Sequence, residues 1–93
     1  MASTKQQTDR MAVGTKYRLT IHEECARLPV LYLGQEGEEH RFGYRNSEQQ
    51  PKLVLVLDAD INEIRGSNII ARASSKRIYG DDGLDKQLKG AEI

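Results

Sequence analysis

Two aspartates that follow an apolar run have the spacing most typical of a metal site. Asp58 and Asp60 come directly after residues 53–57, with one residue between them. Carboxylates at the end of a strand can hold Mg²⁺, because this hard cation prefers oxygen ligands. Such sites also need a parallel sheet and further carboxylates, which a 93-residue chain of this pattern can scarcely supply. We therefore expect Asp58 to end the strand and Asp60 to cap the next turn, and we predict no bound metal or other cofactor.

Three other side chains have the chemistry of a zinc ligand or a nucleophile: His22, Cys25 and His40. His22 and Cys25 are separated by two residues, a gap that zinc sites use. Structural zinc takes four ligands, usually in two close pairs, but Cys25 is the only cysteine and His40 stands alone. A lone cysteine is more typical of a small buried hydrophobic residue, which is the interpretation favoured for Cys25.

Patterns typical of nucleotide hydrolysis and of serine nucleophiles are absent from the sequence. Gly34 and Gly37 lie near acidic residues, and neither belongs to a phosphate-binding glycine pattern. Ser74 and Ser75 precede Lys76 and have no nucleophile-elbow context. We therefore predict that the protein is not an enzyme.

Basic side chains are unevenly distributed although the formal net charge is zero. Residues 65–80 hold four basic and no acidic side chains, whereas residues 23–64 hold four basic and nine acidic ones. A basic patch beside an aromatic ring can bind a phosphate backbone while the ring stacks on a base. The candidate binding residues are Lys16, Arg18, Arg41, Arg45, Arg72, Lys76, Arg77 and Tyr79. An ordinary solvated surface, or one that fits a charged protein partner, explains the same residues, since a pI near 6.7 is not that of a strongly basic nucleic-acid binder.

Short strands are the elements expected to position these residues. Apolar and polar residues alternate in the first and third strands, and the fourth is apolar on both faces, which is typical of a central strand. The second and third strands are joined by a glycine-containing loop, which predicts a hairpin. Single helical turns are expected at residues 23–28 and 61–64, with a rival register that extends the fourth strand through Ile61. The expected strands cover residues 16–22, 29–34, 40–45, 52–57 and 68–73.

Five short strands with brief loops predict a mainly β fold, a small antiparallel barrel or a curled meander. The order of four strands, a helical turn and a fifth strand is similar in layout to SH3-like and Sm-like barrels. The predicted domain covers residues 16–80, between a flexible N-terminal tail at 1–15 and a weakly ordered C-terminal tail at 81–93 with one turn at 84–88.

The functional hypothesis is a non-enzymatic binding module that acts through a protein partner, as an adaptor, an inhibitor or a subunit of a complex. A nucleic-acid-binding barrel that uses the basic patch is the alternative, and self-association through strand edges stays open. The longest apolar run, residues 53–57, is far shorter than the ~20 residues of a membrane-spanning helix. With a single cysteine and no signal-peptide pattern, the sequence predicts a cytoplasmic protein that is not embedded in a membrane.

Overall fold

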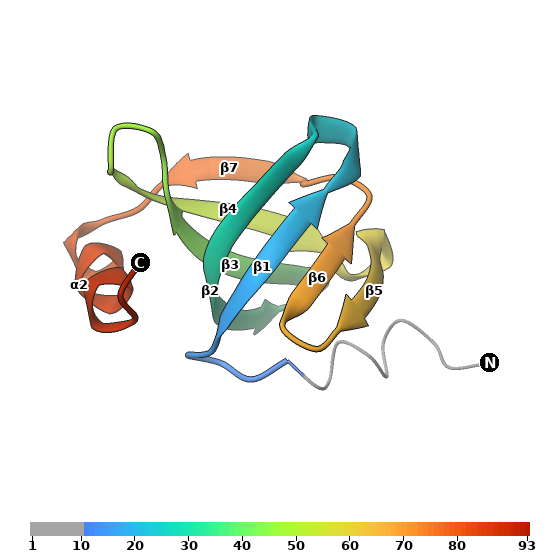
Figure 1. Ribbon diagram of the computed structural model, residues 1–93, viewed down its shortest axis with the longest axis horizontal. Coiled ribbons are helices and arrows are strands. Elements are labelled where there is room, and N and C mark those ends of the chain that lie inside the picture. The colour runs from blue at the N-terminus through green and yellow to red at the C-terminus, as the bar shows by residue number, and fades with distance from the viewer. Residues whose placement is uncertain (1–10) are drawn as a thin grey trace.

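The computed structural model describes residues 11–93, which form a curled β-sheet with one helix beside it (Figure 1). Two 3-10 turns, η1 (His22–Glu24) and η2 (Asp58–Asp60), follow the first and fourth strands, and the helix is α2 (Asp82–Gly90). The strands are β1 (Lys16–Ile21), β2 (Ala26–Glu36), β3 (Glu39–Arg45), β4 (Pro51–Leu57), β5 (Ile61–Arg65), β6 (Asn68–Ala71) and β7 (Lys76–Tyr79).

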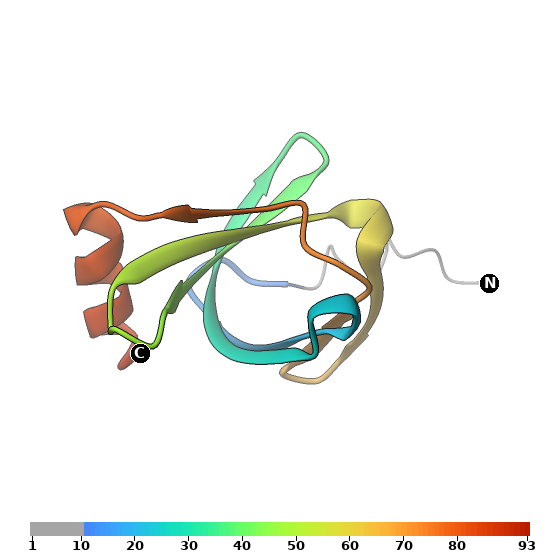
Figure 2. The same cartoon turned by 90° about the horizontal axis from the view of Figure 1, so that it is seen from above.

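The strands form one mixed sheet in the order β5-β6-β1-β2-β3-β4-β7. Neighbouring strands are antiparallel except β1 and β6, which are parallel. The sheet wraps around a common interior, but its two edge strands, β5 and β7, do not pair with each other (Figures 1 and 2). The prediction of a mainly β fold is confirmed. Instead of a five-stranded antiparallel barrel, residues 11–93 form a seven-stranded mixed sheet that does not close.

The main hydrophobic core lies on the inner, concave side of the sheet. The predicted alternation in β1 is confirmed, because Leu19 and Ile21 are fully buried while Lys16 and Arg18 are exposed. Fully buried side chains also come from β2, β3, β4, β5 and β6; they are Val30, Phe42, His40, Val54, Val56, Ile61 and Ile69. Six strands therefore contribute to one core.

The helix α2 covers part of the outer face and makes a second, smaller core. Leu84 and Leu88, one helical turn apart, pack with Leu31, and Leu53 of β4 joins them. Gly43 permits this close packing, since a Cβ there would lie 2.8 Å from Leu84 Cδ1. The C-terminal segment expected to be weakly ordered thus contains a nine-residue helix. The strand β4 is apolar on both faces because both are covered, although it lies next to the edge strand β7 rather than at the centre.

Proline in β2 marks where the expected strand boundary is wrong. The strand begins at Ala26, before Pro29, instead of after a helical turn. The Tyr32 N–H donates to the Thr15 carbonyl, so alternation along β2 directs the backbone nitrogen of residue 29 away from β1. On that other side, β3 pairs with β2 only from Leu31 onward. Position 29 therefore needs no N–H donor, and proline is tolerated there.

Around Ile61 the structure also differs from the sequence-based prediction. The turn lies at η2, and residues 61–65 form β5 instead of a helical turn. Ile61 is fully buried in the main core and Ile64 packs against that core, which favours a strand for this segment. The edge strand β7 was not predicted as a separate strand.

Candidate functional site

The structure spreads the sequence-predicted binding residues over several surfaces. Lys16 and Arg18 lie on β1, Arg41 and Arg45 on β3, and Arg72 follows β6. Lys76, Arg77 and Tyr79 lie on β7, which is separated from β1 by three strands. These residues do not form a single basic patch.

Arg45 holds the C-terminal segment against the sheet. Its Nε donates to the Ile93 carbonyl at 2.8 Å, and its Nη1 pairs with Asp85 of α2 at 2.8 Å. The hydrogen bond from Arg45, followed by that from Lys89, lowers the pKa of Asp85. The Arg45 side chain is only 13% exposed, so its guanidinium stabilises the fold and is not free for a ligand.

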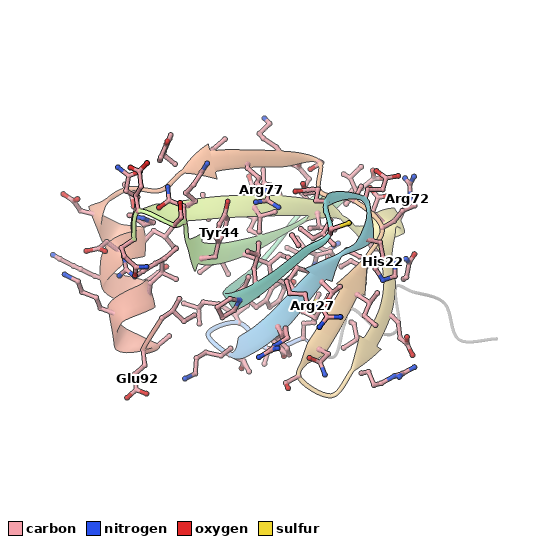
Figure 3. The ribbon with its side chains drawn as sticks, turned by 45° about the horizontal axis from the view of Figure 1, so that its top comes forward. His22, Arg27, Tyr44, Arg72, Arg77 and Glu92 are labelled. Atoms are coloured by element: carbon pink, nitrogen blue, oxygen red, sulfur yellow. The ribbon has the colours of Figure 1, made fainter. Side chains whose placement is uncertain are left out.

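Arg77 and Arg72 also have acidic partners within the chain. Arg77 pairs with Glu24 of η1, and its guanidinium carbon lies 5.6 Å from the centre of the Tyr44 ring (Figure 3). Arg72 donates to Asp60 from Nε at 3.1 Å and from Nη2 at 2.6 Å, and the hydrogen bond and charge of Asp60 raise its pKa. Arg72 and Arg77 are therefore already paired with carboxylates of the same chain.

Glu24, in the turn between β1 and β2, is hydrogen-bonded to the segment that begins β7. Its carboxylate accepts hydrogen bonds from the N–H and the hydroxyl of Ser74 and from Arg77. Burial raises the pKa of Glu24, but the Ser74 hydrogen bond and the Arg77 charge more than offset this, so the pKa lies below its ordinary value.

The two aspartates considered for Mg²⁺ have basic partners instead. Asp58 Oδ1 lies 2.9 Å from His40 Nε2, and His40 Nδ1 lies 2.8 Å from the Tyr32 hydroxyl. Asp60 is buried and accepts from Arg72; the helical turn that it was expected to cap, at residues 61–64, is the strand β5 instead. Within residues 11–93, no group of three or more His, Cys, Asp or Glu side chains is placed to hold a metal ion.

Cys25 differs from the sequence-based interpretation because it is exposed. It has a left-handed backbone conformation, with φ of 50°, at the end of η1. His40 is fully buried and bonded to Tyr32 and Asp58, so it does not complete a site with His22 and Cys25.

Beside α2, on the outer face of the sheet, two adjoining cavities of about 460 and 450 Å³ make a hollow. Both are lined by Leu33, Arg41 and Gln87. The first cavity extends to Val13, and the second extends to Tyr79. We call this combined hollow the α2 groove; its defining residues are Val13, Leu33, Arg41, Tyr79, Gln87 and Gly90.

The large hydrophobic side chains with the greatest exposure in the described chain lie at the α2 groove. Val13 is 68% exposed and Tyr79 is 67% exposed, and each lines one of the two cavities. Ile78, 41% exposed, pairs with Leu53 of β4, which lines the second cavity. Tyr79 pairs with Lys52, whose Nζ lies 4.6 Å from the centre of the Tyr79 ring. The groove therefore has an apolar side chain at each end.

Arg41 lies between these ends and, among the residues that the structure describes, is the only cation that lines either cavity. Its ion-pair contact among residues 11–93 is with Glu36 at 3.6 Å, where the two side chains are 41% and 81% exposed. Asp81 also lines the second cavity, but its Oδ1 accepts the Leu84 N–H at 2.9 Å. Arg41 is thus held only by a loose, solvated contact.

Of the sequence-predicted residues, the α2 groove brings together only Arg41 and Tyr79. From the sequence, Val13 was expected in the tail, and Gln87 and Gly90 in the weakly ordered segment, so none of the three was predicted as a binding residue. No spacing in the sequence relates these positions, because packing of α2 on the sheet creates the groove.

In the described part of the chain, no helix is long and apolar enough to cross a lipid bilayer. Comparison of the sequence with protein-family models and curated proteins, and of the chain with solved structures, finds no match.

Proposed function

We propose that the protein is a non-enzymatic binding module that holds a segment of a protein partner in the α2 groove. The observation that carries this proposal is the position of Val13 and Tyr79, the two most exposed large hydrophobic side chains of the described residues, which line two adjoining cavities. Exposed apolar side chains grouped at a hollow are typical of interaction sites, and aromatic residues often dominate the binding energy there.

Nucleic-acid binding is the alternative function. It would use the predicted basic residues as phosphate contacts and Tyr79 as a stacking ring. Against it, Arg45, Arg72 and Arg77 are engaged by carboxylates of the same chain, and the cations at Lys16 and Lys76 lie on strands that are far apart in the sheet. The engaged arginines favour the protein-binding proposal.

Selection from a phage-displayed library of random 12-residue peptides on the immobilised protein tests the proposal. We expect enriched peptides whose binding falls at least tenfold in Tyr79→Ser and in Val13→Ser, because each substitution removes apolar contact area at one end of the groove. Asn62→Ser, an exposed position on β5, is the matched control and should leave binding unchanged.

Two results would contradict the proposal. One is a selection without enrichment, or with peptides that bind Tyr79→Ser and Val13→Ser as tightly as the original protein. The other is binding of labelled single-stranded RNA, single-stranded DNA or duplex DNA, measured by fluorescence anisotropy, that is lost between about 50 and 200 mM salt. That result would favour the nucleic-acid alternative.

A further inference from the structure

The α2 groove has a length that can be derived from the sheet. The Gly14 N–H donates to the Tyr32 carbonyl, so the residues beside Val13 lie next to β2. From there to Tyr79 on β7 the strands follow in the order β2, β3, β4, β7. One spacing from the Val13 segment to β2 and three spacings between these strands, each of about 4.8 Å, give a groove of about 19 Å across the strands.

Arg41 lies at the middle of this length, because β3 is two strands from each end of the groove. An extended peptide advances about 3.3 Å per residue, so six residue steps span the groove and three steps separate each end from its middle. A ligand that fills both ends would therefore present its central residue to Arg41.

The space beside α2 fits an extended chain better than a second helix. Leu84 and Leu88 pack over the row of the sheet that contains Gly43. Arg41 is two residues farther along β3, about 7 Å away. Packed helices need about 8–10 Å between their axes. An extended segment is narrower and can lie directly over Arg41.

The helix contributes two glycines and one glutamine to this wall of the groove. Gly83, Gln87 and Gly90 occur at i, i+4 and i+7, and all three line the cavities. Neither glycine has a positive φ, and a Cβ at Gly90 would meet nothing within 4 Å. A Cβ at Gly83 would lie 3.3 Å from Asp81 Oδ1, so glycine there gives room to the helix cap, whereas at Gly90 it leaves room for a ligand.

The charge of the ligand follows from Arg41. A guanidinium binds a carboxylate through two parallel hydrogen bonds, and Arg41 has only the loose contact with Glu36 to exchange for them. Building on the proposed function, we propose that the partner segment is an extended peptide with an acidic residue three positions from an apolar residue on each side. The apolar residues occupy the cavities at Val13 and Tyr79, and the carboxylate pairs with Arg41.

The test uses three pools of fluorescein-labelled heptapeptides of the form Leu-x-x-Z-x-x-Leu, where x is a mixture of serine and alanine. The central residue Z is glutamate, glutamine or lysine. We expect the glutamate pool to bind the full-length protein about fivefold more tightly than the glutamine pool, and the lysine pool to bind weakest. A fourth pool, with glutamate moved to the second position, should lose this advantage.

Arg41→Gln should abolish the preference for glutamate, so that the glutamate and glutamine pools bind this variant equally. Arg65→Gln is the matched control, since Arg65 is an exposed arginine paired with Glu63 on β5, outside the groove, and it should retain the preference. Circular dichroism verifies that each variant is folded.

The inference is overturned if the glutamate and glutamine pools bind equally, if Arg41→Gln keeps the preference, or if no pool binds at millimolar peptide. Failure of the inference is distinguishable from failure of the proposed function. Display-selected peptides that require Tyr79 and Val13 but not Arg41 would support the function and refute the acidic ligand.

Discussion

Gly80 connects β7 to α2, and replacing it with alanine tests how closely the helix is held. Its N–H donates to the Pro51 carbonyl at 2.8 Å. A Cβ at this position would overlap Leu84 Cδ2 and lie 3.1 Å from both Cβ and Cγ of Leu84. Rotation of the Leu84 side chain does not move its Cβ, so the helix backbone itself must shift.

The expected cost of Gly80→Ala can be bounded from two sides. Overpacking a well-packed site costs about 1–3 kcal/mol. Releasing α2 altogether would expose Leu84 and Leu88, at about 1.5–3 kcal/mol each, or about 3–6 kcal/mol together. The protein should adopt the less costly response, so we predict a loss of about 1–3 kcal/mol in the free energy of unfolding.

Thermal and urea denaturation measure this loss. For a chain of this length, each kcal/mol lowers the melting temperature by about 4–8 °C, so Gly80→Ala should melt at least about 4 °C lower. Hydrogen exchange should also be faster in α2 than in β1. Gly90→Ala is the control, because a Cβ there meets nothing within 4 Å, and it should be neutral or stabilising by up to about 1 kcal/mol. A Gly80→Ala protein as stable as the original would refute the packing of α2 described above.

Two further predictions concern the contacts of His40 and Glu24. Tyr32→Phe removes the hydroxyl that contacts His40 Nδ1 in the core, and should lower the free energy of unfolding in urea by about 1–3 kcal/mol; an unchanged midpoint would show that this contact is unimportant. Because the folded-state pKa of Glu24 lies below its ordinary 4.5, its ion pair stabilises the protein fully above about pH 4.5 and is lost as the pH falls through the folded-state pKa. The difference in melting temperature between the original protein and Glu24→Gln should therefore shrink from pH 6 to pH 3, and a constant difference would contradict this assignment.

The parts of the fold that the sequence predicted are those with local patterns. Alternation of Tyr17, Leu19 and Ile21 with polar residues was sufficient to identify β1 and its buried face. The apolar run of β4 was identified because both its faces are covered, although only one turn of the covering helix, at residues 84–88, was predicted, and the edge strand was not. These elements have hydrophobic patterns that do not depend on distant parts of the chain.

The parts that were missed depend on contacts between distant residues. The helix α2 has only Leu84 and Leu88 to bury, and it is stabilised by the surface around Leu31 that β2 provides. The ion pair of Arg77 joins it to Glu24, 53 positions earlier, so its side chain looked free in the sequence. The groove residues Val13 and Gly90 are near each other only because of packing.

The parallel pairing of β1 with β6 has a consequence for how the protein folds. Arg18 pairs with Asn68, which lies 50 positions later, whereas β2 follows β1 after one short turn. The antiparallel meander from β1 to β4 can therefore form early, while the second neighbour of β1 must wait for a non-local closure, which is typical of domains that fold in milliseconds to seconds. In the interval β1 is an open edge, and the charged, exposed Lys16 and Arg18 would protect it from pairing with other chains.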